Sequence, residues 1–334
     1  MRYSTAPARG LTVRILLTFA LMLPAAAAHA QAPYPNRPVT IIVSLAAGTG
    51  MDTLVRLYGE KLSQALGQPV IIENKPGGAG VIAGETIVKG APDGYTLAVA
   101  TSAVMAIRPT LFKVRPFDPM SDFIPISNYV KSPFVLIVNP SIPAKTAKEF
   151  IDYVKQRPGQ LSYSSSGIGG APHLTMELLK QKFGLDIAHV PYRNSPQSIA
   201  DVAAGHVNAA VAEAGASLPL IRDGKLRALA VTSAARFPSM PDVPPLADAV
   251  AVPGLEAVSW HVLFVRRDTP RPIVDRLHGE MKRIIDTPDM QQRIANIGLI
   301  PVATPSVEGI QTYIKDETEK WGTLVRQLGL AGSQ

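Results

Sequence analysis

Short apolar runs alternate along the chain with segments in which apolar residues recur every three or four positions. A compact apolar run bounded by turn residues predicts a strand, whereas a period of about 3.6 residues predicts an amphipathic helix. Leu54, Tyr58 and Leu62 form such a stripe within 52–65, and a similar stripe runs through 270–286. Strands are expected at 39–44, 69–73, 95–101, 134–138, 161–165, 188–192, 207–212, 226–232 and 259–265. This alternation predicts an α/β fold.

The length and composition of the chain predict two packed lobes. Its 334 residues are enough for about two domains of roughly 100–200 residues each. With 46% hydrophobic and 18% charged residues the chain can bury a large core, so a disordered or fibrous protein is excluded. The sequence has no cysteine, which excludes disulfide scaffolds, thiolate metal sites and cysteine nucleophiles.

The N-terminal segment has the order of a secretory signal. Arg2, Arg9 and Arg14 precede the apolar run 15–23, and the segment ends in the small-residue motif 28–30. The run is shorter than the ~20 residues that span a bilayer, so a retained membrane anchor is the weaker alternative. There is no twin-arginine pair, which favours the general secretory route. We expect cleavage after Ala30 and a mature protein in the periplasm, where nucleotide cofactors are scarce.

The net charge gives little support to nucleic-acid binding. The formal charge is +7, and it falls to +4 when the three arginines of the leader are removed. The remaining charge is spread along the chain without a run of Lys or Arg, so no nucleic-acid partner is expected. An anionic small molecule fits the same charge.

Two segments, 39–52 and 161–173, follow one plan: an apolar or small-residue strand, a Gly-rich turn and the start of a helix. Such a turn exposes backbone N–H groups beside the positive end of the helix dipole, which favours an anion. The alternative is that glycine and serine only make tight turns. Two copies, expected one in each lobe, favour a ligand held between the lobes.

Several motifs occur in one serial order across the mature chain. They are Y-P-N-R-P at 34–38, A-G-T-G-M-D at 47–52, E-N-K-P-G-G-A-G at 73–80, A-P-D-G-Y-T-L at 91–97, V-P-Y at 190–192 and G-K-L-R-A-L-A-V-T at 224–232. Together they resemble the Bug family of extracytoplasmic solute receptors, the substrate-binding component of tripartite tricarboxylate transporters. The resemblance covers essentially the whole mature chain.

The resemblance implies a two-lobed periplasmic-binding-protein fold, type II-like, with the ligand in the cleft. Two crossings between the lobes are expected near 132–134 and 258–260. Residues 1–30 would be the signal peptide, 31–133 and 259–334 the first lobe, and 134–258 the second lobe.

The resemblance also implies a site for a carboxylate on the amides and hydroxyls of the two turns. The matching positions are Ala47, Gly48, Thr49, Gly50 and Asp52 in the first turn, Ser165, Ser166, Gly167, Gly169 and His173 in the second, and Thr101, Ser102, Tyr192 and Asn194 along the walls. Two of these have a structural alternative. Asp52 can act as a helix N-cap, and His173 can simply pack.

The chain departs from the family pattern at several site positions. Ser-Leu-Ala at 44–46 stands where Pro-Phe-Pro is usual, and Thr49 and Asn194 stand where glycine is common. The family often has an aspartate at the position of Ala212, with Glu213 next along and expected on the opposite face of the strand. A ligand ammonium group is therefore not expected, and whether Glu213 replaces the missing acid stays open.

Enzymatic motifs are weak or missing. G-x-G-x-x-A at 78–83 is separated from the preceding strand by Pro76 and Gly77, unlike a dinucleotide-binding turn. There is no G-x-S-x-G elbow and no close pair of histidines, so no catalytic residue, metal or cofactor is expected.

We therefore predict a monomeric, non-catalytic periplasmic receptor that delivers a small carboxylate to the membrane permease of a tripartite tricarboxylate transporter. Dicarboxylates or aromatic carboxylates are favoured over amino acids. The alternatives are the same fold used as a sensor or scavenger without its own transporter and, behind it, a secreted hydrolase.

Overall fold

The computed structural model describes residues 1–3, 34–77 and 80–334. The chain divides into two units, 1–36 and 37–334, and the strands and helices described belong to the second. The expected signal peptide, with its cleavage point after Ala30, lies almost wholly outside the described residues.

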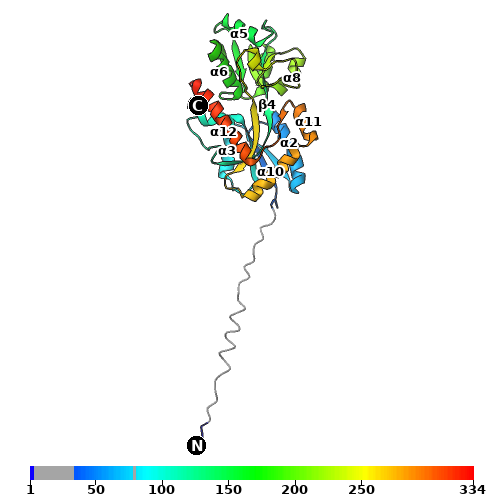
Figure 1. Ribbon diagram of the computed structural model, residues 1–334, viewed down its shortest axis with the longest axis vertical. Helices are drawn as coiled ribbons and strands as arrows, with labels where there is room; N and C mark the ends of the chain where they lie inside the picture. Colours follow the sequence, from blue (N-terminus) through cyan, green and yellow to red (C-terminus); the bar gives the residue numbers. More distant parts are fainter. Residues whose placement is uncertain (4–33, 78–79) are drawn as a thin grey trace. The chain divides into compact units, whose positions relative to one another are not determined.

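The second unit contains two mixed β-sheets with helices packed on them (Figure 1). The first sheet has six strands in the order β11-β4-β10-β3-β1-β2. Their bounds are β1 (Val39–Val43), β2 (Val70–Asn74), β3 (Thr96–Thr101), β4 (Phe123–Ser132), β10 (Ser259–Arg266) and β11 (Ile300–Pro301). β1 is parallel to β2 and β3, and β10 is antiparallel to β3 and β4.

The second sheet has five strands in the order β7-β6-β8-β5-β9. Their bounds are β5 (Phe134–Val138), β6 (Ser162–Ser165), β7 (Ala188–Pro191), β8 (Ala209–Glu213) and β9 (Arg227–Val231). β6 is parallel to β7 and β8, while β5 is antiparallel to β8 and β9. The chain enters this sheet after Pro133 and returns to the first sheet between β9 and β10.

Helices follow most of the strands. They are α2 (Gly50–Leu66), α3 (Val81–Lys89), the π-helix η2 (Ala103–Ile107), α4 (Arg108–Leu111), α5 (Ala147–Lys155), α6 (Ala171–Phe183), α7 (Ser195–Ala204), α8 (Ala214–Arg222), α9 (Leu246–Ala249), α10 (Arg271–Ile285), α11 (Pro288–Asn296) and α12 (Val307–Gln327). The expected stripe of Leu54, Tyr58 and Leu62 is completely buried. The α/β fold class is confirmed, and each of the nine expected strands lies at or within a residue or two of an observed one.

Strand β4 was not expected from the sequence. Pro125, Ser127 and Asn128 interrupt its apolar pattern, yet β4 pairs along its whole length with β10 through a ladder that shifts register twice. Ser127 is buried and shares a 2.8 Å hydrogen bond with Thr304, whereas the Oδ1 of the buried Asn128 has no partner among the described residues. Irregular pairing of this kind is set by the neighbouring strand, so periodicity along β4 alone does not reveal it.

One apolar core is continuous across both sheets. It includes Met105 and Ile310 beside the first sheet and Leu136 and Leu174 in the second. Trp260 at the start of β10 and Trp321 on α12 are both buried in it. Their indole N–H groups donate to the same carboxylate oxygen of Glu317, at 2.9 and 3.0 Å.

Among the described residues, no helix combines the length and apolar character that crossing a bilayer requires.

Candidate functional site

The two Gly-rich turns lie at the sheet edges that face one another. The first turn follows β1, and the second follows β6. β4 runs parallel to β3 and β1, because both β3 and β4 are antiparallel to β10, so β4 ends at the same edge as β1. β5 is antiparallel to β8, which is parallel to β6, so β5 begins at the edge where β6 ends. Only Pro133 separates β4 from β5, and this places both turns at the junction of the sheets.

The first turn is closed by Thr49, which is the N-cap of α2. The Thr49 hydroxyl accepts from the Asp52 amide at 3.4 Å and donates to the Ala46 carbonyl at 2.9 Å. Gly48 adopts φ +80°, and its amide donates to Asp52 Oδ2 at 2.9 Å. The interpretation of Asp52 as the N-cap is therefore wrong. Asp52 lies in the first turn of α2, and its carboxylate accepts the hydrogen bond from the Gly48 amide of the preceding loop.

The Asp52 carboxylate is buried and fully engaged. Its Oδ1 accepts from Asn74 Nδ2 at 2.9 Å and forms an ion pair with Arg56 at 3.0 Å. Burial by itself raises the pKa of Asp52, but hydrogen bonds from Arg56, the Gly48 amide and Asn74 outweigh it and lower the pKa. Asn74 and Arg56 were not among the residues predicted from the sequence, although Arg56 lies four positions after Asp52, the spacing of a helical ion pair.

The second turn is organised around Ser165, at the end of β6. Its hydroxyl lies 2.8 Å from His189 Nε2, 3.1 Å from the Gly167 carbonyl oxygen and 3.3 Å from the Gly167 amide nitrogen. Gly169, with φ +78°, donates its amide to His173 Nδ1 at 3.2 Å. In this structure His173 thus contacts the turn itself.

Three rings stack beneath the second turn. Tyr163 lies 4.7 Å from His189 and His189 lies 4.4 Å from His173, measured between ring centroids. Burial lowers the pKa of both histidines, and His189 reaches about 4 with a further contribution from a charged His173. His189 was missed from the sequence. Its place beside Tyr163 depends on the register of the parallel strands β6 and β7, which the sequence pattern does not determine.

Each turn also keeps amides that a ligand could use. Within the described residues, the amides of Ala47 and Gly50 in the first turn donate to no protein acceptor, nor do those of Ser166, Ile168 and Gly170 in the second. The expected cradle is thus smaller than the sequence implied, because the Gly48 and Gly169 amides are already bonded to side chains.

The second turn also contacts the helices of the first sheet. A Cβ atom on Gly169 would lie 2.0 Å from Leu111 Cδ2 of α4, so a larger residue at this position would displace the end of the Leu111 side chain. The turn and α4 are therefore in direct contact in this structure.

The four expected wall residues all have structural partners. Ser102 is completely buried and donates to Ser259 at 3.2 Å, and Thr101 pairs with β10 in the sheet. The Tyr192 hydroxyl donates to Asp201 at 2.5 Å, which raises the pKa of Tyr192 to about 12. Asn194 is the N-cap of α7, and its side chain accepts from the Gln197 amide at 2.9 Å.

The alternation expected for Ala212 and Glu213 is present, because β8 continues through Glu213. Ala212 is buried in the apolar cluster with Ile199 of α7 and Leu226. Glu213 belongs to the opposite face of the strand and is half-buried, and burial raises the pKa of its carboxyl group. Among the described residues, no side chain bonds to that carboxyl group.

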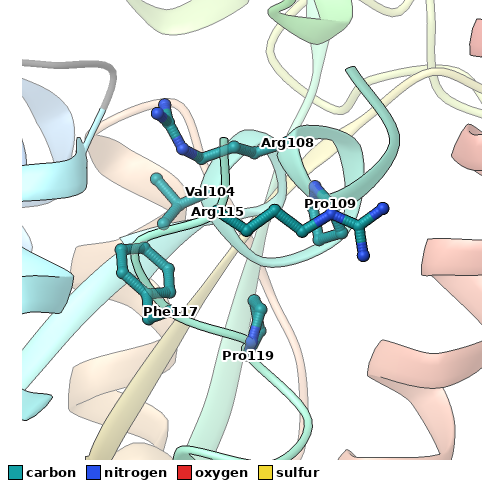
Figure 2. Close-up of a pocket in the computed structure, with 6 residues that line it drawn as sticks. All are labelled: Val104, Arg108, Pro109, Arg115, Phe117 and Pro119. Atoms are coloured by element: carbon teal, nitrogen blue, oxygen red, sulfur yellow. The ribbon is translucent and has the colours of Figure 1, made fainter. Parts of the chain in front are cut away.

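A small pocket lies between η2, α4 and the following loop (Figure 2). It is lined by Val104, Arg108, Pro109, Arg115, Phe117 and Pro119. Its volume of about 10 Å³ is room for about one water molecule. The guanidinium groups of Arg108 and Arg115 point in opposite directions in Figure 2, so they do not converge on one anion.

In the part of the chain that the structure describes, no three His, Asp or Glu side chains could hold a metal ion.

The chain is similar to a family of transporter receptors. The family model described as "Tripartite tricarboxylate transporter family receptor" matches residues 54–330. Protein BugT of Bordetella pertussis is 32% identical over 298 residues, which cover 89% of this chain and 90% of BugT. A protein of R. palustris solved with adipate has 33% identity and a TM-score of 0.83, covering 89% of this chain and 99% of its own. MatC from Rhodopseudomonas palustris, solved with bound malate, has 29% identity and a TM-score of 0.78, covering 87% of this chain and 100% of its own.

Proposed function

Since this chain belongs to the tripartite tricarboxylate transporter receptor family, we propose that it is a non-catalytic receptor that encloses a small carboxylate and delivers it to the family's membrane permease. Two structures similar to this chain were solved with adipate and with malate, and both compounds are dicarboxylates. A dicarboxylate is therefore the ligand class that we favour.

The observation that carries this proposal is the pairing of two Gly-rich turns at facing sheet edges. Both turns precede helices, α2 and α6, whose N-termini are the positive ends of the helix dipoles. Free amides remain on each turn, at Gly50 in the first and at Ser166, Ile168 and Gly170 in the second. A ligand with one carboxylate at each end has an acceptor for each set of donors.

We further propose the lobe boundaries 31–133 with 259–334, and 134–258. Support comes from the strands, because β1 to β4, β10 and β11 share one sheet and β5 to β9 share the other. The mature protein would act as a monomer in the periplasm after export and cleavage following Ala30. The family and the order of charged, apolar and small residues in the leader support this location.

Thermal unfolding in the presence of candidate ligands tests the proposal. A ligand that binds only the native state stabilises it by about 2.7 kcal/mol at a hundredfold excess over Kd. We expect adipate, malate or an aromatic carboxylate to raise Tm, and sugars and polyamines to leave it unchanged. If a sugar or a polyamine is the only compound that raises Tm, the carboxylate proposal is wrong.

A further inference from the structure

The two turns share one local hydrogen-bonding arrangement. In each turn, a glycine with positive φ donates its amide to the side chain four residues later: Gly48 to Asp52 at 2.9 Å and Gly169 to His173 at 3.2 Å. The acceptors differ in chemistry. Asp52 is a carboxylate already held by Arg56, whereas His173 is an imidazole, whose acceptor nitrogen is lost when the ring is protonated.

The second turn is held at another point by a second imidazole. The Ser165 hydroxyl has one proton, and its 3.1 Å contact with the Gly167 carbonyl uses that proton because a carbonyl can only accept. The hydroxyl oxygen therefore accepts from His189 Nε2–H at 2.8 Å and from the Gly167 amide. This arrangement makes His189 the donor and His173 the acceptor, so the two rings have complementary roles.

We propose that the stacked imidazoles of His189 and His173 are positioning residues for ligand binding at the second turn, an inference that rests on the function proposed above. His189 holds the Ser165 hydroxyl, and His173 holds the Gly169 amide. Together they set the conformation in which the free amides of Ser166 and Ile168 are presented to a carboxylate. Neither ring has to touch the ligand.

The same arrangement makes the turn sensitive to acid. Protonation of His173 removes the acceptor of the Gly169 amide, and two charged rings 4.4 Å apart repel one another. Burial opposes protonation of both rings. The charges that act on the pair are Glu177 and Lys180 on α6, and Tyr163 on β6 donates to Glu177. The neighbouring elements also carry Lys182 on α6, Glu213 on β8, Glu317, Lys320 and Arg326 on α12, and Arg108 on α4.

The immediate charges largely neutralise one another. Glu177 accepts from Lys180 at 2.8 Å and from the Tyr163 hydroxyl at 2.7 Å. A negative Glu177 favours protonation of the histidines, while Lys180 disfavours it. The stack therefore stays neutral near neutral pH, and the turn keeps both of its hydrogen bonds.

Variants of His189 separate its hydrogen bond from its packing. His189→Phe keeps a ring in the stack and removes the donor, and we expect it to weaken adipate binding about fivefold, the effect of one net hydrogen bond. His189→Gln supplies an amide donor near the position of Nε2 and should regain most of that loss. His278→Gln, on α10 and bonded to the Ile126 carbonyl, is the matched control outside the turn. Calorimetric titration with adipate measures all four proteins.

The pH profile is the readout that packing alone would not change. As the pH falls from about 6.5 toward about 4, the range set by the lowered pKa of the two histidines, wild-type affinity for adipate should fall relative to the double variant His173→Asn with His189→Gln. Asparagine offers an acceptor oxygen near the position of Nδ1 that does not titrate in this range. Protonation of adipate is common to both proteins and cancels in the ratio of their Kd values.

A measurement without ligand tests whether His173 holds the Gly169 amide, whether or not the proposed function is right. In ¹⁵N-labelled ligand-free protein, the Gly169 amide resonance should move with pH in the wild type and stay constant in His173→Asn. If no dicarboxylate binds the wild type, the proposed function fails, and this titration still decides whether His173 holds the turn. A Gly169 resonance independent of pH overturns the inference. Equal adipate affinity in His189→Phe and the wild type also overturns it.

Discussion

His261, in the middle of the long strand β10, is a buried imidazole with an unmet hydrogen-bonding atom. The residue is 4% exposed, and its Nδ1 has no partner among the described residues. It packs against the edge of Tyr129 with ring centroids 6.4 Å apart. Burial lowers the pKa of His261 to about 4, because a charged ring would lose its hydration there.

This pKa predicts how stability depends on pH. The folded pKa of His261 lies below the unfolded value of about 6.5, so the unfolded state binds more protons between these values. The stabilisation is therefore complete above about pH 6.5 and is lost as the pH falls toward about 4, by an amount on the order of 3 kcal/mol.

Urea unfolding of His261→Phe across this range measures the contribution of His261. We expect the free energy of unfolding of the variant to fall less steeply with acid than that of the wild type. Phe264→Leu on the same strand removes packing without removing a titrating group. It should therefore lower the free energy of unfolding at every pH with little change in its slope against pH. Parallel curves for the wild type and His261→Phe would contradict the prediction.

At the scale of elements, the two Gly-rich turns differ more than their sequences indicate. Gly48 and Gly169 have nearly the same φ, but a Cβ atom at Gly48 would meet no atom within 4 Å. At Gly169 it would meet Leu111 Cδ2 of α4 at 2.0 Å. Both turns therefore favour glycine for their backbone conformation, and at Gly169 an added Cβ would also displace the Leu111 side chain of α4.

Alanine substitutions should separate these two requirements. Gly48→Ala should lower the free energy of unfolding by about 1–3 kcal/mol, the usual effect of a strained backbone conformation. Gly169→Ala should lower the free energy of unfolding by more than Gly48→Ala does. When Leu111→Ala is added to Gly169→Ala, we expect this extra loss to disappear, and a double-mutant cycle from urea unfolding measures the coupling. Equal costs at the two glycines, with no coupling between Gly169 and Leu111, would show that the contact does not matter.

At the scale of the whole described unit, two glycines set how closely the elements of the two sheets approach. Gly298, just before β11, packs its backbone against Gly215 at the start of α8, and a Cβ on Gly298 would lie 2.4 Å from the Gly215 Cα. Both partners in this contact are backbone, so the clash cannot be relieved by rotating a side chain. The structure described here needs glycine at this contact.

Gly298→Ala should therefore favour an arrangement in which the sheets stand further apart. We expect solution scattering with saturating adipate to give a larger radius of gyration than for the wild type, together with weaker adipate binding, because a ligand stabilises a state only through its differential affinity. Gly254→Ala is the control, since Gly254 has a similar φ of +74° and no atom within 4 Å of its Cβ position. Identical scattering and affinity in Gly298→Ala and Gly254→Ala would rule out a role for the contact.

The α/β alternation, nine of the eleven strands that the described residues form, and the place of the two turns could be predicted from the sequence. These features depend on local causes: apolar periodicity selects strand or helix, and glycine permits the positive φ of the turns. Local causes also placed Ala212 and Glu213 on opposite faces of one strand. Strand β4 could not be read in this way, because Pro125 and Asn128 are tolerated only beside the irregular ladder of β10.

The tertiary structure alone decided which groups of the turns are free to bind. The Gly48 and Gly169 amides looked available, but the side chains of Asp52 and His173 turn back and take them. His189 reaches Ser165 only because β7 pairs in register with β6, and Leu111 reaches Gly169 from a distant part of the chain. Such contacts join residues far apart in the chain, and they depend on side-chain directions that a periodic pattern does not encode.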